Sequence, residues 1–206
     1  MATRTPWRPC GRSEGVGVKV ISVADVPAVP WRNGGGLTRE LLAWPDPADW
    51  RLRVSVADIA SDGPFSAFPG VTRVFAVLEG PGVVLTWPER RVEQRTTDAP
   101  LTFDGADPPK GQLLDGPVRD LNVMCRGASV SVLPATTPWR PGEGARAGLF
   151  TRVPGQWQCG PQSVSVPALT LLWDDAASGG EWQFVADTDD TTRPAGWWIL
   201  HEDTHA

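Results

Sequence analysis

The residues best suited to bind a ligand lie on an expected strand over residues 51–59. Alternation places Arg53 and Ser55 on one face of this strand and apolar side chains on the other. Burying an unpaired guanidinium is costly, so an arginine on an interior face needs a partner. Arg53 can hold a ligand carboxylate through two parallel hydrogen bonds, and Ser55 can add a hydroxyl group. The alternative is an internal ion pair, for instance between Arg53 and Asp120.

A second expected strand, residues 120–125, places Asp120, Asn122 and Met124 on one face. The Asn122 side chain can both donate and accept hydrogen bonds, which suits a formyl, amide or imidazole group. We therefore predict that Asp120 and Asn122 contact the ligand. The alternative for Asn122 is a buried amide bonded to the backbone.

Arg73 follows a Phe-Pro-Gly turn and is predicted to make a second contact to an anion. A salt bridge from Arg73 to Glu79 or to Asp62 explains the same residue equally well. Both interpretations stay open at the level of sequence.

Three consecutive glycines, residues 34–36, form a turn in which the backbone can approach a ligand or another strand closely. We expect Asn33 and Thr38, on either side of these glycines, to line the mouth of a pocket. The turn's N–H groups could form an anion-binding nest, although a simple tight turn would need the same glycines. Trp31, Phe65 and Phe68 are expected either to flank a flat ligand or to close a barrel.

Several kinds of chemistry are excluded by residue types. The only histidines are His201 and His205, so the usual histidine-based metal site is not expected, and we predict no metal and no other cofactor. No Gly-x-Ser-x-Gly motif is present, and no histidine precedes residue 201 to activate a serine or cysteine. The three cysteines show no CxxC spacing. Acid/base catalysis by Asp62, Asp120 or Glu40 remains a candidate chemistry.

The elements that must position these residues are predicted to be short strands. Glycine and proline together make up 43 of the 206 residues, while 41% of residues are hydrophobic, and no sequence period is visible. This composition favours an all-β jelly roll or β-barrel with many turns. Residues 1–16 are expected to be a flexible lead-in, and residues 134–148 a connection between two parts.

Charge and hydropathy limit the partners and the location. The net charge of −5 gives no basic footprint for nucleic acid. No secretory signal or membrane-spanning apolar run is visible, so the cytoplasm is the expected location and no membrane contact is expected. Trp197 and Trp198 should point to opposite faces of a late strand, and one of them could contribute to a homodimer interface.

Several segments resemble the HutD/Ves family of cupin-related proteins, which is linked to bacterial histidine utilisation and to stress responses. They are residues 31–40, 53–57, 62–70, 73 with 78–82, and 103–107 leading to 116–124. The resemblance implies a single cupin-like β domain over residues 17–206, built from two halves at about 17–133 and 145–206. It also implies a small anionic ligand from histidine breakdown, such as urocanate, formylglutamate or formiminoglutamate, and a regulatory role.

Taken together, these residues predict a metal-free protein that binds a small anionic metabolite. Arg53 would hold its carboxylate, Ser55 and Asn122 its polar far end, and Trp31 or Phe65 one wall. Two alternatives are an isomerase or hydrolase with a carboxylate base, and an interaction module with a vestigial pocket.

Overall fold

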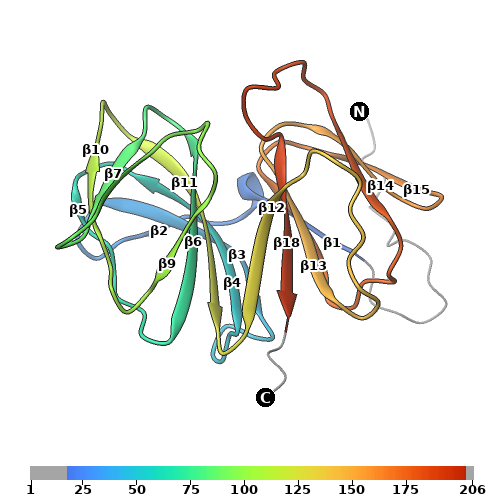
Figure 1. Cartoon of the computed structure of the whole chain (residues 1–206), viewed down its shortest axis with the longest axis horizontal. Coiled ribbons are helices and arrows are strands. Elements are labelled where there is room, and N and C mark those ends of the chain that lie inside the picture. Colours follow the sequence, from blue (N-terminus) through green and yellow to red (C-terminus); the bar gives the residue numbers. More distant parts are fainter. Residues whose placement is uncertain (1–17, 203–206) are drawn as a thin grey trace, which may run out of the picture.

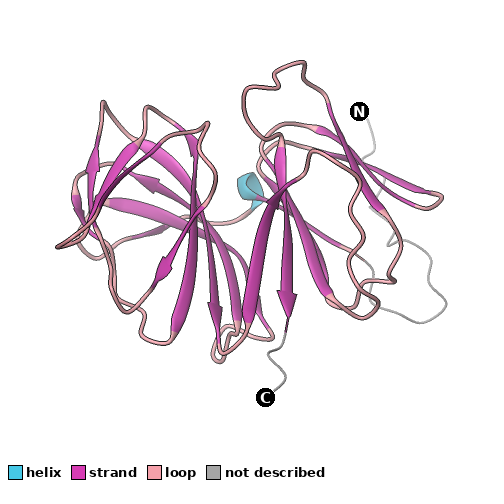
Figure 2. Cartoon of the chain, viewed as in Figure 1, coloured by secondary structure: helices cyan, strands magenta, loops and turns pink. Residues whose placement is uncertain are grey.

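The computed structural model describes residues 18–202, and almost all of its regular structure is β-strand. One 3-10 turn, η1 (Val23–Asp25), is the only helical element that it describes (Figure 2). No helix within residues 18–202 is long and apolar enough to cross a membrane. The expected lead-in, residues 1–16, lies outside the described residues.

The strands form two bodies that lie side by side, and the first of them contains two sheets (Figure 1). Its larger sheet has six strands, in the order β2 (Val29–Pro30), β3 (Gly36–Trp44), β4 (Leu52–Ile59), β11 (Val118–Arg126), β6 (Val71–Glu79) and β9 (Leu101–Asp104). Its smaller sheet has four strands, in the order β5 (Gly63–Pro64), β10 (Lys110–Leu113), β7 (Val83–Thr86) and β8 (Arg91–Gln94). All pairings are antiparallel.

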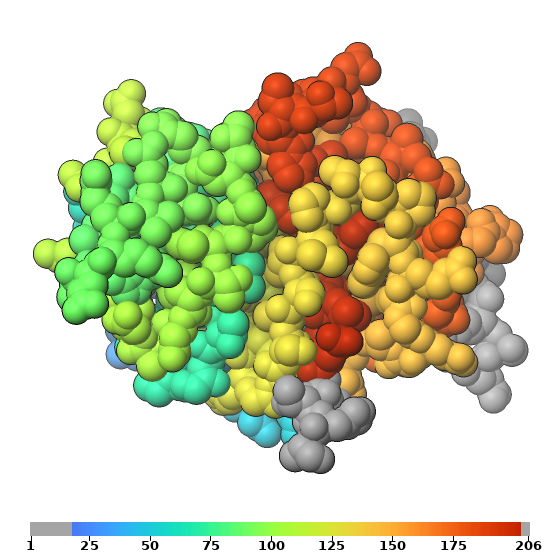
Figure 3. Space-filling model, viewed as in Figure 1, coloured from blue at the N-terminus to red at the C-terminus, as the bar shows by residue number. Residues whose placement is uncertain are grey.

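The second body repeats this arrangement with fewer strands. Its larger sheet has five, in the order β1 (Lys19–Ser22), β16 (Thr170–Asp174), β13 (Arg146–Thr151), β18 (Gly196–Glu202) and β12 (Ser129–Pro134). Its smaller sheet has three, in the order β15 (Gln162–Val166), β14 (Gly155–Cys159) and β17 (Trp182–Ala186). The two bodies are joined by their larger sheets, and the space-filling view shows the green first body meeting the yellow and red surface of the second (Figure 3).

The boundary between the halves differs from the expected one. β1, and β12 up to its last residue, fall within the expected first half, 17–133, but they are the two edge strands of the second body's larger sheet. Ile21 of β1 and Val130 and Val132 of β12 pack against the core between the bodies. Burial of these apolar side chains explains why both strands join the second body.

Apolar side chains form three cores, one inside each body and one between them. The middle core shows the alternation clearly, because Leu52, Val54 and Val56 of β4 all face it. The opposite face of β4 is thereby turned into the interior of the first body, where Arg53 and Ser55 lie.

The two tryptophans of β18 follow the same rule. Trp197 faces the middle core and Trp198 the core of the second body, so they point to opposite faces as expected. Both are buried, with exposed fractions of 0% and 2%. The prediction that one of them contributes to a homodimer interface is therefore wrong, because neither side chain reaches the surface.

Candidate functional site

A cavity of about 690 Å³ opens in the first body, on the face of the six-stranded sheet that is turned away from the middle core. Four neighbouring strands, β3, β4, β11 and β6, supply its floor, and the segments around Trp31 and Phe65 supply its walls. The structure brings all nine predicted site residues to this cavity: Trp31, Asn33, Thr38, Arg53, Ser55, Phe65, Arg73, Asp120 and Asn122.

The register of the central strands explains this convergence. On the paired strands β4 and β11, Asn122 lies directly opposite Ser55, and Asp120 lies opposite Ala57. On β6, Arg73 lies opposite Met124 of β11. Residues that share a face and a register are neighbours across a sheet, so three strands present one continuous polar surface to the cavity.

Arg53 forms an ion pair within the cavity. Its Nε donates to Glu40 Oε2 at 2.5 Å, and both side chains remain partly exposed. The ion pair that the sequence left open for Arg53 therefore exists, but its partner is Glu40 on β3 and not Asp120. Both Arg53 and Glu40 line the cavity.

Arg73 is almost completely buried, at 4% exposure. Its guanidinium carbon lies 5.3, 5.6 and 5.2 Å from the ring centroids of Phe65, Phe68 and Phe103, and its Nη1 donates to the Ser66 carbonyl at 3.2 Å. Burial lowers the pKa of Arg73 to about 10. Its buried Nε has no hydrogen-bond partner among the described residues.

Neither salt bridge considered for Arg73 forms. Glu79 accepts a hydrogen bond from Arg119 at 2.9 Å, and Asp62 accepts one from the Leu113 backbone at 2.8 Å. Asp62 does not line the cavity, whereas Glu40 and Asp120, the other two candidate acid/base residues, do.

Asp120 and Asn122 place unsatisfied oxygen atoms at the floor. Asp120 is 1% exposed, and neither of its carboxylate oxygens has a hydrogen-bond partner within the described chain. The same holds for the buried Asn122 Oδ1, so the backbone-bonded alternative for this oxygen is not what the structure shows. Burial raises the pKa of Asp120 to about 8, although the nearby Arg73 acts in the opposite direction.

The glycine turn shapes the rim of the cavity, and the N–H groups of its first two glycines donate within the turn. Gly34 has the positive φ of 70° that favours glycine, and its N–H donates to the Trp31 carbonyl at 3.0 Å. The Gly35 N–H donates to Asn33 Oδ1, also at 3.0 Å. These two N–H groups are used inside the turn, so they do not supply the anion nest that the sequence allowed.

Trp31 is fixed against the start of β3. Its Nε1 donates to Thr38 Oγ1 at 2.7 Å, and its ring lies over Gly36, where an added Cβ would come within 3.1 Å of ring carbons. A side chain at Gly36 would also lie 2.4 Å from the Asp58 carbonyl oxygen. The third glycine is therefore required for the tryptophan wall to pack on the strand.

Arg32, Glu40 and Met124 also line the cavity, although they were not among the predicted ligand contacts. Glu40 could have been found by alternation, since it lies two residues after Thr38 on the same strand. The charged lining residues are then three arginines and two acids. Since burial favours the neutral form of Asp120 near neutral pH, the cavity carries a clear positive excess and suits an anion.

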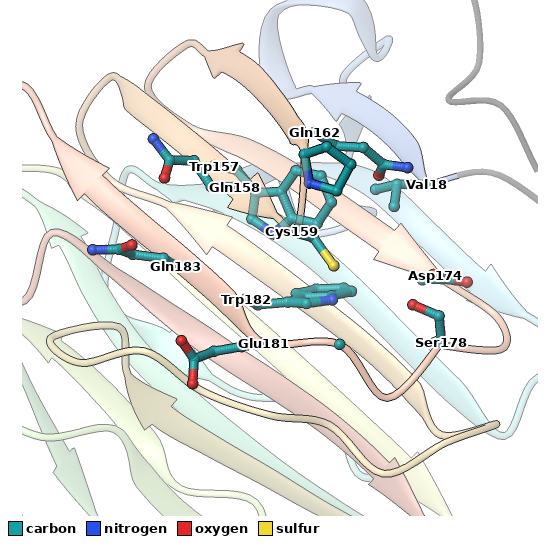
Figure 4. Close-up of a pocket in the computed structure, with 13 residues that line it drawn as sticks. Val18, Trp157, Gln158, Cys159, Gln162, Asp174, Ser178, Glu181, Trp182 and Gln183 are labelled. Atoms are coloured by element: carbon teal, nitrogen blue, oxygen red, sulfur yellow. The ribbon is translucent and has the colours of Figure 1, made fainter.

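A second cavity, of about 630 Å³, lies in the second body. Figure 4 shows the indole rings of Trp157 and Trp182 at its centre, with Gln162 and Gln183 toward its two sides. Its lining residues, all of them described, include no arginine, lysine or histidine. It therefore lacks the cationic groups that distinguish the first cavity. Within residues 18–202, no three His, Cys, Asp or Glu side chains gather to hold a metal ion.

The chain is similar to several known proteins. The HutD family matches residues 23–143. Protein Ves of Citrobacter koseri is 34% identical over 154 residues, which cover 72% of this chain and 79% of that protein. An uncharacterized 21.2 kDa protein from the hutC 3′ region of Pseudomonas putida is 33% identical over 111 residues, or 52% of this chain and 57% of that protein.

Solved structures agree on the fold. HutD from Pseudomonas fluorescens SBW25, solved in a formate condition, superposes with a TM-score of 0.75 at 22% identity, covering 92% of this chain and all of that one. The expected cupin-related, all-β fold is confirmed. From the match over residues 23–143 and the similarity to Ves, the chain belongs to the HutD/Ves family.

Proposed function

We propose that this protein binds a small carboxylate metabolite in the cavity of its first body. The observation that carries the proposal is the group of buried polar atoms without partners, Arg73 Nε, both Asp120 oxygens and Asn122 Oδ1, on the floor of a cavity rich in arginine. Buried polar groups are normally satisfied, and unsatisfied ones call for an explanation. A ligand that supplies hydrogen bonds to them provides one.

The positions of the side chains suggest how such a ligand would lie. Arg53, partly exposed, would hold a carboxylate near the opening. Asn122 Oδ1 would accept an N–H from the buried end, and Arg73 Nε would donate to an acceptor there. Trp31 or Phe65 would form one wall. The ligand would thus carry a negative charge at one end and a planar polar group at the other.

Intermediates of histidine breakdown have this form, and we propose them as the ligand class. Urocanate, formylglutamate and formiminoglutamate each combine a carboxylate with an imidazole, amide or amidine. Membership of the HutD/Ves family supports this choice. We further propose that the protein has a regulatory role in the cytoplasm, and that it binds the metabolite without converting it.

Thermal unfolding with each compound tests binding. A ligand at about 100 times its Kd should stabilise the fold by about 2.7 kcal/mol, which for this chain length raises the midpoint by roughly 5–10 °C. Arg53→Ala should abolish the rise. Arg95→Ala, which removes an exposed arginine paired with Glu93 outside the cavity, should leave it unchanged. No rise with any compound in the folded wild type would overturn the proposal.

One observation favours an enzyme as the second candidate. The pKa of Asp120, raised to about 8 by burial, lies in the range that suits a general acid or base near neutral pH. Turnover can be followed by proton NMR of each compound. If Asp120→Asn keeps binding and abolishes a turnover that the wild type shows, the protein is an isomerase or hydrolase; a wild type that binds without turnover supports the first candidate.

A further inference from the structure

Glu40 and Arg53 form a pair of opposite charges in which both members face the ligand cavity. The side chains keep 39% and 23% of their surface exposed, so the pair is solvated and open to a ligand. The single bond between them joins Arg53 Nε to Glu40 Oε2. Both Arg53 Nη atoms and Glu40 Oε1 form no further hydrogen bond with the described residues.

The backbone of β3 is irregular at the point that places Glu40 here. Its pairing with β4 shifts register between Glu40 and Leu42, so that Glu40 is opposite Ser55 and Leu42 is opposite Val54. Without this bulge, Glu40 and Leu42 would share a face. With it, Leu41 and Leu42 both contact the middle core while Glu40 faces the cavity. The bulge thus keeps a carboxylate beside Arg53 without exposing a leucine to the cavity.

An exposed ion pair contributes little to stability, so folding alone does not explain why a carboxylate stands beside the main anion contact. For a ligand with a carboxylate alone, Glu40 is a disadvantage, because it repels the incoming charge and competes for Arg53. For a ligand with a protonated nitrogen next to its carboxylate, the same pair is complementary, since Arg53 takes the carboxylate and Glu40 the cation.

We propose that Glu40 is a specificity residue that selects acids bearing a protonated nitrogen beside the carboxylate, as in an α-amino acid or an α-amidinium acid. This inference rests on the proposed function and narrows its ligand class. Among the histidine-derived compounds it favours formiminoglutamate, whose amidine is protonated at neutral pH. In this compound the α-carboxylate and the amidinium would face Arg53 and Glu40, so its second carboxylate, and not the amidine, would take the buried end near Arg73 Nε. It disfavours formylglutamate, whose amide is neutral on the same skeleton, and urocanate, which has no cationic nitrogen beside its carboxylate.

Calorimetric titration with two matched pairs tests the inference. The first pair is formiminoglutamate and formylglutamate; the second is L-glutamate and glutarate, which differ only in the α-ammonium group. The wild type should bind the cationic member of each pair about tenfold more tightly, as expected for one charge-assisted contact. Glu40→Gln should abolish this preference by weakening the cationic member and strengthening the other.

A control substitution tests whether the effect is specific to Glu40, and the possible results separate failure of this inference from failure of the proposed function. Glu93→Gln removes an exposed glutamate that pairs with Arg95 outside the cavity, and it should leave both ratios unchanged. If formylglutamate and glutarate bind the wild type as tightly as their partners, or if Glu40→Gln keeps the preference, the selection role is overturned while anion binding stands. If no compound of either pair binds the folded wild type, the proposed function fails as well.

Discussion

Asp120 is the residue at which burial has the clearest thermodynamic consequence. Its pKa rises from an ordinary value of 3.8 to about 8 in the folded protein. Between these values the folded state holds a proton that the unfolded state has lost, so stability falls as pH rises. The contribution of Asp120 is fully present below pH 3.8 and has been lost once the pH passes about 8.

Asp120→Asn should remove this pH dependence. Urea unfolding between pH 5 and 8 should show the wild type losing stability relative to the variant, with a limiting slope of about 1.4 kcal/mol per pH unit for one proton. The buried amide keeps the size of the carboxyl group but does not titrate. Parallel stability curves for the two proteins over this range would contradict a raised pKa at Asp120.

The site residues were predictable from sequence to the extent that strand alternation identifies faces. Polar side chains at positions 53, 55, 120 and 122 interrupt otherwise apolar strands, and this interruption located the cavity floor. The partner of Arg53 was not predictable. It depends on the β3 bulge that sets Glu40 opposite Ser55, and a bulge of one residue leaves no distinct pattern in the sequence.

At the scale of elements, the turn before β3 depends on the absence of a side chain at Gly36. Gly36→Ala would place a Cβ 2.4 Å from the Asp58 carbonyl oxygen and 3.1 Å from Trp31. We expect this overpacking to cost about 1–3 kcal/mol of unfolding free energy and to displace the Trp31 wall. Urea unfolding measures the first effect, and weaker ligand binding reports the second.

Gly63→Ala is the matched control for that experiment. Like Gly36, Gly63 is the first residue of a strand in the first body, but an added Cβ there meets nothing within 4 Å. Its stability should stay close to that of the wild type. Equal effects of the two substitutions would show that the close approach at Gly36 is not what constrains the turn.

Two of the longer strands were predicted because polar and apolar residues alternate along them. The expected strand over 51–59 matches β4 (Leu52–Ile59), and the expected strand over 120–125 lies inside β11 (Val118–Arg126). β12 and β14 differ in how clearly their sequences indicate a strand. In β12, SVSVLP, serine and valine alternate, so the same rule also identifies this strand. In β14, GQWQC, only one large apolar residue stands among polar ones, so local pattern gives little sign of a strand that tertiary pairing stabilises.

At the scale of the whole molecule, Arg152 is placed to hold the two bodies together. It follows β13 of the second body, and its Nη1 donates to the Pro194 carbonyl there at 3.2 Å. It also reaches the first body, where Nη1 contacts the Thr96 carbonyl at 3.4 Å and Nη2 the Leu78 carbonyl at 3.5 Å. One buried side chain thus serves backbone groups on both sides of the junction.

Arg152→Met should therefore destabilise the protein by about 1–3 kcal/mol, because it leaves buried carbonyl groups without donors while keeping much of the side-chain volume. Arg140→Met removes an arginine whose contact with Glu181, at 3.6 Å, is exposed, and it should change stability by under about 1 kcal/mol. Equal unfolding free energies for Arg152→Met and the wild type would show that the junction does not depend on this residue.

The association of the two bodies was only partly visible in the sequence. The family resemblance implied two halves, but residues 19–22 and 170–174 lie far apart in the chain and pair in space as β1 and β16. Nothing local to either segment specifies that partner. The choice is made by burial of residues such as Ile21 in the core between the bodies, which forms only when both are present.

The most direct test of the proposed binding site is an NMR titration of the arginine Nε–H signals with urocanate, formylglutamate and formiminoglutamate in turn. Bound ligand should shift the Nε–H signals of Arg53 and Arg73, because both residues line the cavity. The Nε–H signal of Arg152 should not move, because this buried arginine does not line the cavity. If none of the compounds moves the Arg53 and Arg73 signals, or if Arg152 shifts as much as they do, the claim that this cavity binds a small carboxylate is contradicted.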